Sequence, residues 1–201
     1  MKIGITINEV LRDFIGQFIY TYNKYIEETD ITHEDVTSFN LLEHFKFDDT
    51  NSLNKFIYSE APLEIFGHAD QMTDGLMIHF NTFLTDIYDE EEHEIILISR
   101  EVEKSIPSTL FFLSKTGCKA TNIKFVTSYA DKWNDIDVLI TANPQTLEAK
   151  PTGKISIKVN TPYNKNTTSD YQIDSILDFI KNTDLREKIL NTKITTYEEL
   201  N

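Results

Sequence analysis

Residues 2–14 read Lys-Ile-Gly-Ile-Thr-Ile-Asn-Glu-Val-Leu-Arg-Asp-Phe, an apolar run that ends in polar side chains. Side chains two residues apart on a strand point to the same face, so Thr6 and Asn8 lie together at the strand's carboxyl end. Open α/β sheets bind their ligands at that edge. Glu9 follows at a place where a tight turn would favour glycine. The stretch therefore predicts a functional edge that presents two neutral side chains, Thr6 and Asn8.

Four further runs share this apolar character, and they lie at 93–99, 122–127, 136–140 and 154–159. Nearly continuous apolar runs are typical of strands buried on both faces, as in a parallel sheet. Between the second and third runs, Pro107 near the start and Gly117 past the end of a helical pattern predict a crossover helix. The sequence therefore predicts an α/β fold with a five-stranded parallel sheet.

Residues 14–90 form a long insertion after the first strand, with helical patterns throughout. Its apolar faces are Phe14, Phe18, Tyr22, Tyr25 and Ile26; Leu41, Leu42 and Phe45; Leu53, Phe56 and Ile57; and Met72, Leu76, Phe80, Phe83, Leu84 and Ile87. Such faces predict a small helical bundle over the sheet's carboxyl edge. We expect an α/β core of residues 1–13 and 91–201, with 14–90 as an inserted helical cap. The chain from Asp170 predicts one or two further helices, with an apolar side made of Ile173, Ile176, Leu177 and Ile180.

The composition indicates a globular protein and excludes several functions. With 201 residues, 40% of them hydrophobic, the chain can bury a substantial core. The net charge of −14 argues against a nucleic-acid partner, because phosphate contacts need clustered Lys and Arg. No apolar run reaches the roughly 20 residues of a membrane span, and no signal sequence opens the chain. We expect no membrane partner and, outside a virion, a cytoplasmic location; the single Cys118 excludes an internal disulfide.

The order of these elements resembles the 5′(3′)-deoxyribonucleotidase-like branch of the haloacid dehalogenase (HAD) superfamily, in which a small helical cap follows the first motif. Four places carry the resemblance: Val-Leu-Arg-Asp-Phe at 10–14, Ser99 at the end of the second run, Lys132 before Trp133, and Val-Leu-Ile-Thr-Ala-Asn-Pro at 138–144. The resemblance implies a HAD-like Rossmannoid sheet. It also implies that Ser99 and Lys132 occupy positions that bind phosphate.

The family's catalytic acids are absent at the matching positions. Where the family has an aspartate nucleophile and an aspartate acid/base, this chain has Thr6 and Asn8, and Thr141 and Ala142 stand where two aspartates would hold magnesium. A threonine without a base is a poor nucleophile, and Asn8 cannot transfer a proton. The four residues offer magnesium no anionic oxygen. The histidines have no metal-ligand spacing: His33, His44, His68, His79 and His93. We expect no catalysis, no metal and no cofactor.

The leading functional expectation is a non-catalytic structural subunit. The resemblance implies phage origin, since proteins of this branch are common in bacteriophages, and the Asn-, Ile-, Lys- and Thr-rich composition fits an A+T-rich genome. The expected place is a virion ring in the tail or neck of a crAss-like phage, with other protein subunits as partners in a homo-oligomer. Eight aromatic residues are more than one small bundle readily buries, so we expect some of them at interfaces: Tyr20, Tyr22, Tyr25, Phe45, Phe47, Phe56, Tyr58 and Phe66.

Two other functions stay open. The first is a pseudoenzyme that binds a nucleotide or phosphate through Ser99 and Lys132, because a hydroxyl, strand-end amides and an ammonium suffice to hold an anion. The second, which is less favoured, is an active phosphatase that uses a displaced acid at Glu9 or Asp13.

Overall fold

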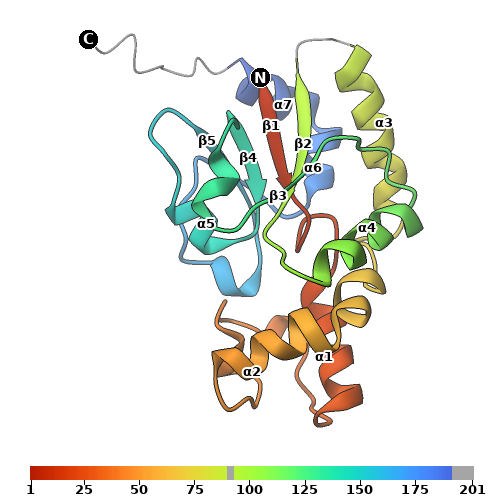
Figure 1. Cartoon of the computed structure of the whole chain (residues 1–201). Helices are drawn as coiled ribbons and strands as arrows, with labels where there is room; N and C mark the ends of the chain where they lie inside the picture. Colours follow the sequence, from red (N-terminus) through yellow and green to blue (C-terminus); the bar gives the residue numbers. More distant parts are fainter. Residues whose placement is uncertain (90–92, 192–201) are drawn as a thin grey trace.

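A parallel six-stranded sheet forms the centre of the computed structural model, which describes residues 1–89 and 93–191. The strand order is β3-β2-β1-β4-β5-β6, and every neighbouring pair is parallel. The strands are β1 (Lys2–Thr6), β2 (Glu94–Ser99), β3 (Ile123–Phe125), β4 (Val138–Thr141), β5 (Ile155–Val159) and β6 (Tyr171–Ile173). The predicted parallel α/β fold is confirmed (Figure 1), and the first five strands overlap the five predicted runs.

The sixth strand corrects the expected five-stranded sheet. The sequence pattern assigns Ile173 to a helix, whereas the structure pairs it with Val159 of β5 at the sheet's edge. A run of three residues is too short for its periodicity to separate a strand from the start of a helix. The predicted carboxyl-terminal helices follow as α6 (Ile176–Lys181) and α7 (Thr183–Leu190).

The two faces of the sheet bury different side chains. One face forms the larger core with helices α3 (Leu76–Asp89), α4 (Ser105–Lys115) and α6, whose rings include Phe80, Phe83, Phe112 and Phe179. The other face packs Ile98 and Leu139 near Trp133, which ends the 3-10 helix η5 (Ala130–Trp133). The Trp133 indole N–H donates to the Thr146 carbonyl of α5 (Pro144–Glu148) at 2.8 Å. Burial on both faces explains the uninterrupted apolar runs.

Helix α3 packs on the sheet and not in the inserted bundle. Its ring at Phe83 lies 5.9 Å from that of Phe179 in α6. The face expected to be the bundle's fourth belongs instead to the core of the sheet: Leu76, Phe80, Phe83, Leu84 and Ile87. Periodicity identifies the buried side of a helix but not the surface that covers it. The expected cap boundary between 90 and 91 lies outside the described residues.

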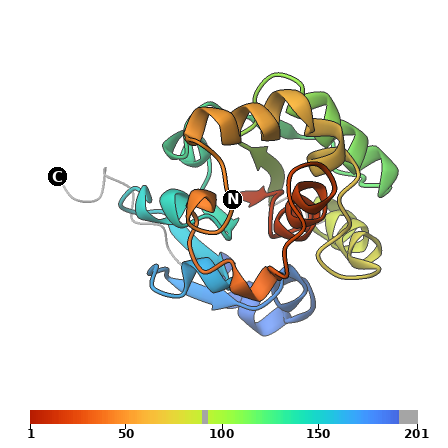
Figure 2. The same ribbon diagram turned by 90° about the horizontal axis from the view of Figure 1, so that it is seen from below.

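The rest of the insertion is a bundle with a hydrophobic core of its own. It contains α1 (Phe14–Tyr25), η1 (His33–Asp35), η2 (Leu41–Glu43), α2 (Thr50–Lys55) and two π-helical turns, η3 (Phe56–Glu60) and η4 (Leu63–Gly67). Phe18 lies at its centre, with ring centroids 4.9 Å from Phe45 and 6.1 Å from Phe56. Figures 1 and 2 show this bundle at the carboxyl ends of the strands.

The bundle buries more of its aromatic residues than the sequence led us to expect. Four of the eight are buried and two are half-buried: Tyr22, Phe45, Phe56 and Phe66, then Phe47 and Tyr58. Only Tyr20 and Tyr25 of that set are exposed, at 59% and 52%. The prediction that the bundle cannot bury these rings is therefore wrong for six of them, because they pack against one another. Within the described residues, no helix has the length and apolarity needed to cross a bilayer.

Candidate functional site

The carboxyl ends of β1 and β4 bring together two threonines, Thr6 and Thr141. The Thr6 hydroxyl donates to Thr141 Oγ1 at 3.1 Å, and both side chains are buried. The backbone N–H of Asn143 also donates to Thr141 Oγ1, at 3.1 Å. Ala142 is buried beside them, and its carbonyl accepts from Asn164 Nδ2 at 2.8 Å. This part of the edge is a closed set of neutral hydrogen bonds.

Asn8 belongs to a buried network that is organised by Arg12. The guanidinium donates to Asn8 Oδ1 from Nε at 2.9 Å and also from Nη2. It forms an ion pair with Glu101 Oε1 at 2.5 Å, with both side chains fully buried. Nη1 donates to the Phe66 carbonyl at 3.1 Å and to Thr109 Oγ1 at 2.6 Å, so Arg12 links the bundle to α4. Asn8 is therefore held as an acceptor for a cation.

Ser99 is committed to the same network. Its hydroxyl donates to Glu101 Oε1 at 2.7 Å, and a carboxylate can only accept. While this bond is present, Ser99 Oγ offers a ligand lone pairs and no proton. In the structure Ser99 therefore has a different role from the phosphate-binding one that the resemblance implies.

Lys132 is a buried cation without a hydrogen-bonding partner. Its side chain in η5 is 5% exposed, and its Nζ lies 5.5 Å from the centre of the Tyr129 ring. Among the described residues, no hydrogen bond or ion pair reaches this ammonium. Burial lowers the pKa of Lys132 to about 8; the charge of Glu101 opposes this shift, and Arg100 adds to it. The N–H donors of this ammonium therefore have no acceptor, and a bound anion would supply one.

A cavity of about 590 Å³ lies between the bundle and the edge of the sheet, and Lys132 lines it. Residues from the sheet side include Thr6, Asn8, Glu9, Ser99 and Tyr163, and those from the bundle include Phe39, Leu41, Leu53 and Tyr58. The Phe39 ring closes one side, 6.1 Å from Tyr129 and 5.7 Å from Tyr163. The cavity is lined by apolar side chains and by a similar number of polar and charged ones, and its volume is in the range of small-molecule sites.

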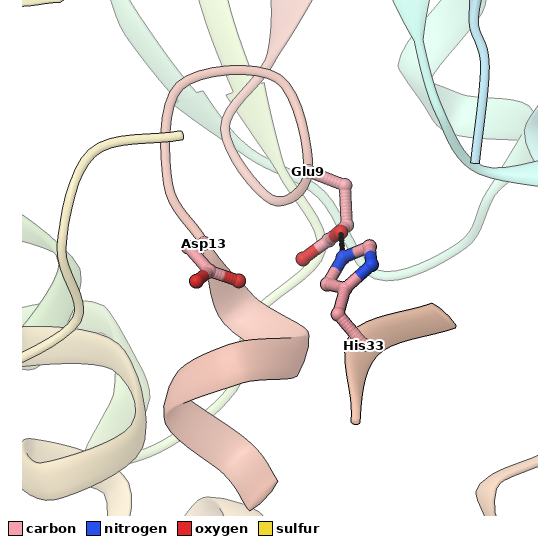
Figure 3. A group of neighbouring side chains, drawn as sticks. All are labelled: Glu9, Asp13 and His33. Carbon is pink, nitrogen blue, oxygen red and sulfur yellow. Dashed lines mark hydrogen bonds and ion pairs between the residues drawn. The ribbon is translucent and has the colours of Figure 1, made fainter. Parts of the chain in front are cut away.

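Glu9 points into a second cluster, next to the cavity. It adopts φ +58° in the turn after β1 and is buried. Its Oε1 accepts from the Ile15 N–H at 2.8 Å, and its Oε2 accepts from His33 Nε2 at 2.7 Å. This hydrogen bond raises the pKa of His33. Asp13, which caps α1 through Gly16 N–H at 2.8 Å, completes the group (Figure 3).

Sequence reasoning missed the partners of these side chains. Arg12 and Glu101 are separated by 89 positions, and Glu9 and His33 by 24, so spacing gave no sign of either pair. The regions that position them, a turn and a 3-10 helix, carry no periodicity. The resemblance found Lys132, whereas its burial and its lack of a partner are properties of the tertiary structure.

Comparisons with known proteins identify the fold. No protein-family model and no curated protein sequence matches the chain. Among solved structures it is similar to a HAD-like hydrolase from Burkholderia xenovorans, with a TM-score of 0.60 at 9% identity over 92% of this chain and 96% of that one. It is also similar to a phosphonoacetaldehyde hydrolase-like protein from Oleispira antarctica, with a TM-score of 0.58 at 12% identity over 96% and 95%. The chain therefore has the fold of HAD-like hydrolases.

The residues at the carboxyl edge do not fit the magnesium ion that the resemblance implies. Thr6 and Thr141 satisfy each other through a hydrogen bond, and the Ala142 side chain has no donor atom. Magnesium prefers anionic oxygen ligands in octahedral geometry, and these three positions supply no carboxylate. We therefore derive no chemical step through magnesium at this edge.

Proposed function

We propose that this protein is a non-catalytic member of the HAD-like fold that binds a small anionic ligand, a phosphate or nucleotide, in the cavity beneath its bundle. The observation that carries the proposal is Lys132, a buried ammonium that lines the cavity and has no hydrogen-bonding partner among the described residues. Charge-assisted bonds to an anion would satisfy its three donors. Asn8 and Tyr129 line the same cavity.

The positions that would carry catalysis lack the chemical groups for it. Thr6 has a neutral threonine as its neighbour and no base, and Asn8 is occupied by the Arg12 guanidinium. Glu9 lines the cavity, but its two oxygens bind the Ile15 amide and His33. Loss of a nucleophile, an acid and metal ligands removes several kcal/mol each of transition-state stabilisation. These contacts support ligand binding in preference to phosphoryl transfer.

A binding and activity experiment tests this proposal. Inorganic phosphate and a nucleoside monophosphate are titrated calorimetrically into the wild-type protein, the Lys132→Met variant and, as a control, the exposed Lys165→Met variant. We expect binding by the wild type and Lys165→Met, and an affinity at least tenfold weaker for Lys132→Met, since a hydrogen bond to a charged group contributes about 1.5–3 kcal/mol. Binding by neither anion, or equal binding by all three proteins, contradicts the proposal.

Phosphatase activity is measured in parallel with the same nucleotide and an aryl phosphate, with and without magnesium. We expect no turnover above that of buffer. Magnesium-dependent turnover that Glu9→Gln abolishes would establish the active-phosphatase alternative.

The assembly function remains a second proposal, supported by fewer exposed aromatic residues than the sequence led us to expect. Tyr20 and Tyr25 in the second half of α1, and Ile26 just after it, are exposed and would supply apolar contact area to other subunits, including those of a virion ring. Native mass spectrometry tests it: a discrete homo-oligomer that Tyr20→Ser with Tyr25→Ser dissociates supports this role, and a monomer at all concentrations removes it.

A further inference from the structure

Three potential metal-ligand side chains from separate segments converge beside the cavity, at a place that the fold family does not use for its own metal. Glu9 comes from the turn after β1, Asp13 from the start of α1, and His33 from η1 of the bundle (Figure 3). One ligand atom from each lies within 4.8 Å of the other two. The threonine pair at the ends of β1 and β4 is a different set of residues.

In each carboxylate of this cluster, one oxygen accepts a hydrogen bond from a backbone N–H and the other is not bonded to the backbone of the described residues. Glu9 Oε1 is fixed by the Ile15 N–H, which leaves Oε2 facing His33. Asp13 Oδ1 is fixed by the Gly16 N–H, and Oδ2 has no hydrogen bond or ion pair among the described residues. A Cβ at position 16 would lie 2.2 Å from Asp13 Oδ2, so glycine there leaves the space that this oxygen occupies.

The backbone that carries the imidazole is held by a local capping box. Asp35 Oδ2 accepts from the Thr32 N–H at 2.9 Å and from the Thr32 hydroxyl at 2.6 Å, which fixes the start of η1. The His33 side chain is 29% exposed, while that of Glu9 is 3% exposed. The cluster is therefore shielded on the Glu9 side and accessible from solvent on the His33 side.

The local charge favours a cation. Within the described part of the chain, no lysine or arginine nitrogen lies within 4.0 Å of a carboxylate oxygen of Glu9 or Asp13. Among the described residues, the charged partner of the buried Glu9 carboxylate at this range is His33, while the Ile15 N–H donates to its other oxygen. Buried charges in proteins are paired or coordinate metals. Two carboxylates with one imidazole are a donor set that suits zinc and manganese.

We propose that Glu9, Asp13 and His33 bind one divalent transition-metal ion, of the Zn²⁺ or Mn²⁺ class, which ties the bundle to the turn after β1. Metal–ligand distances of about 2.0–2.2 Å place neighbouring ligand atoms about 3.3 Å apart in a tetrahedral site. The separation of 2.7 Å between Glu9 Oε2 and His33 Nε2 would widen slightly, and Asp13 would move closer. Three protein ligands leave the fourth position to water or to a molecule in the cavity that Glu9 lines.

Metal titration of the untagged, chelator-treated protein tests this site. Zn²⁺, Mn²⁺ and Mg²⁺ are titrated calorimetrically, and Co²⁺ is used as a spectroscopic probe of imidazole and carboxylate ligation. We expect one equivalent of Zn²⁺ or Mn²⁺ to bind, to give a ligand-field spectrum with Co²⁺, and to raise the melting temperature, because a ligand of the folded state stabilises it by mass action.

Two conservative variants and one control locate the binding. Asp13→Asn retains the helix cap, since asparagine caps as well as aspartate does, and His33→Gln retains a polar side chain. Each should weaken the affinity for Zn²⁺ at least tenfold, whereas His79→Gln, at an exposed histidine on α3, should leave it unchanged. Binding of less than one equivalent, or an affinity that neither variant reduces, overturns the proposal. So does binding of Mg²⁺ alone.

Discussion

Replacing Lys132 with methionine should stabilise the folded protein while it removes the proposed anion site. Methionine keeps an unbranched stem of similar length and omits the ammonium. The pKa of Lys132 is about 8 against an ordinary value of 10.5, because burial disfavours the charged form. At about 1.4 kcal/mol for each pKa unit, the buried charge costs the folded state about 3 kcal/mol.

The pH dependence of this effect has a definite sign. Between pH values of about 8 and 10.5, the unfolded chain holds the Lys132 proton while the folded chain has released it. This residue therefore makes stability rise as the pH increases through that window, and its cost is fully present below about pH 8. The advantage of Lys132→Met should be greatest near pH 7 and mostly lost near pH 10.5.

Denaturant unfolding at the two pH values measures the effect. We expect the free energy of unfolding of Lys132→Met to exceed that of the wild type by about 3 kcal/mol near pH 7, or roughly 6–12 °C in melting temperature. Lys165→Met, at an exposed position, should change stability by no more than about 0.5 kcal/mol. A Lys132→Met variant that is less stable than wild type near pH 7, or equally stabilised at both pH values, would refute the reasoning.

Two further predictions concern buried contacts. Glu101→Gln leaves the fully buried Arg12 guanidinium without its counter-charge, so it should lower the free energy of unfolding by about 3–5 kcal/mol in denaturant. The double variant Glu101→Gln with Arg12→Met should recover part of this loss. Purely additive effects of the two substitutions would contradict the prediction. Gly16→Ala should displace the Asp13 carboxylate from α1 and cost about 1 kcal/mol, but should become neutral or stabilising in an Asp13→Ala background. Equal effects in both backgrounds would show that the Cβ does not meet that carboxylate.

The sheet was accessible to sequence reasoning because its strands carry a physical signature. Ile3, Ile5 and Ile7 face the core on one side of the sheet, and Ile98 and Leu139 face the core on the other side. The strands are therefore apolar on both faces, and their runs have almost no polar interruptions. Strand β6 escaped because Tyr171–Ile173 is too short to show a period. The packing of α3 escaped for another reason: an apolar helix face is equally compatible with a bundle and with a sheet.

The candidate site was accessible only in part. The resemblance located Thr6, Thr141 and Lys132, and the structure places the two threonines in contact. It gave no sign of the Arg12–Glu101 pair that occupies Asn8 and Ser99, because ion pairs between distant segments leave no local pattern. For the same reason, inspection of histidine spacing failed to place His33 beside Glu9.

The bundle and the sheet have separate hydrophobic cores, and this has a consequence for amide hydrogen exchange. Phe18 and its neighbours form the core of the bundle, whereas Ile5 belongs to the larger core of the sheet, so the bundle and the sheet can open as distinct cooperative units. We expect the amides of α1 to share similar protection factors, and the amides of β1 to have higher ones. An occupant of the cavity would contact both units and so draw the two protection factors together, which makes exchange a report of occupancy that requires no knowledge of the ligand.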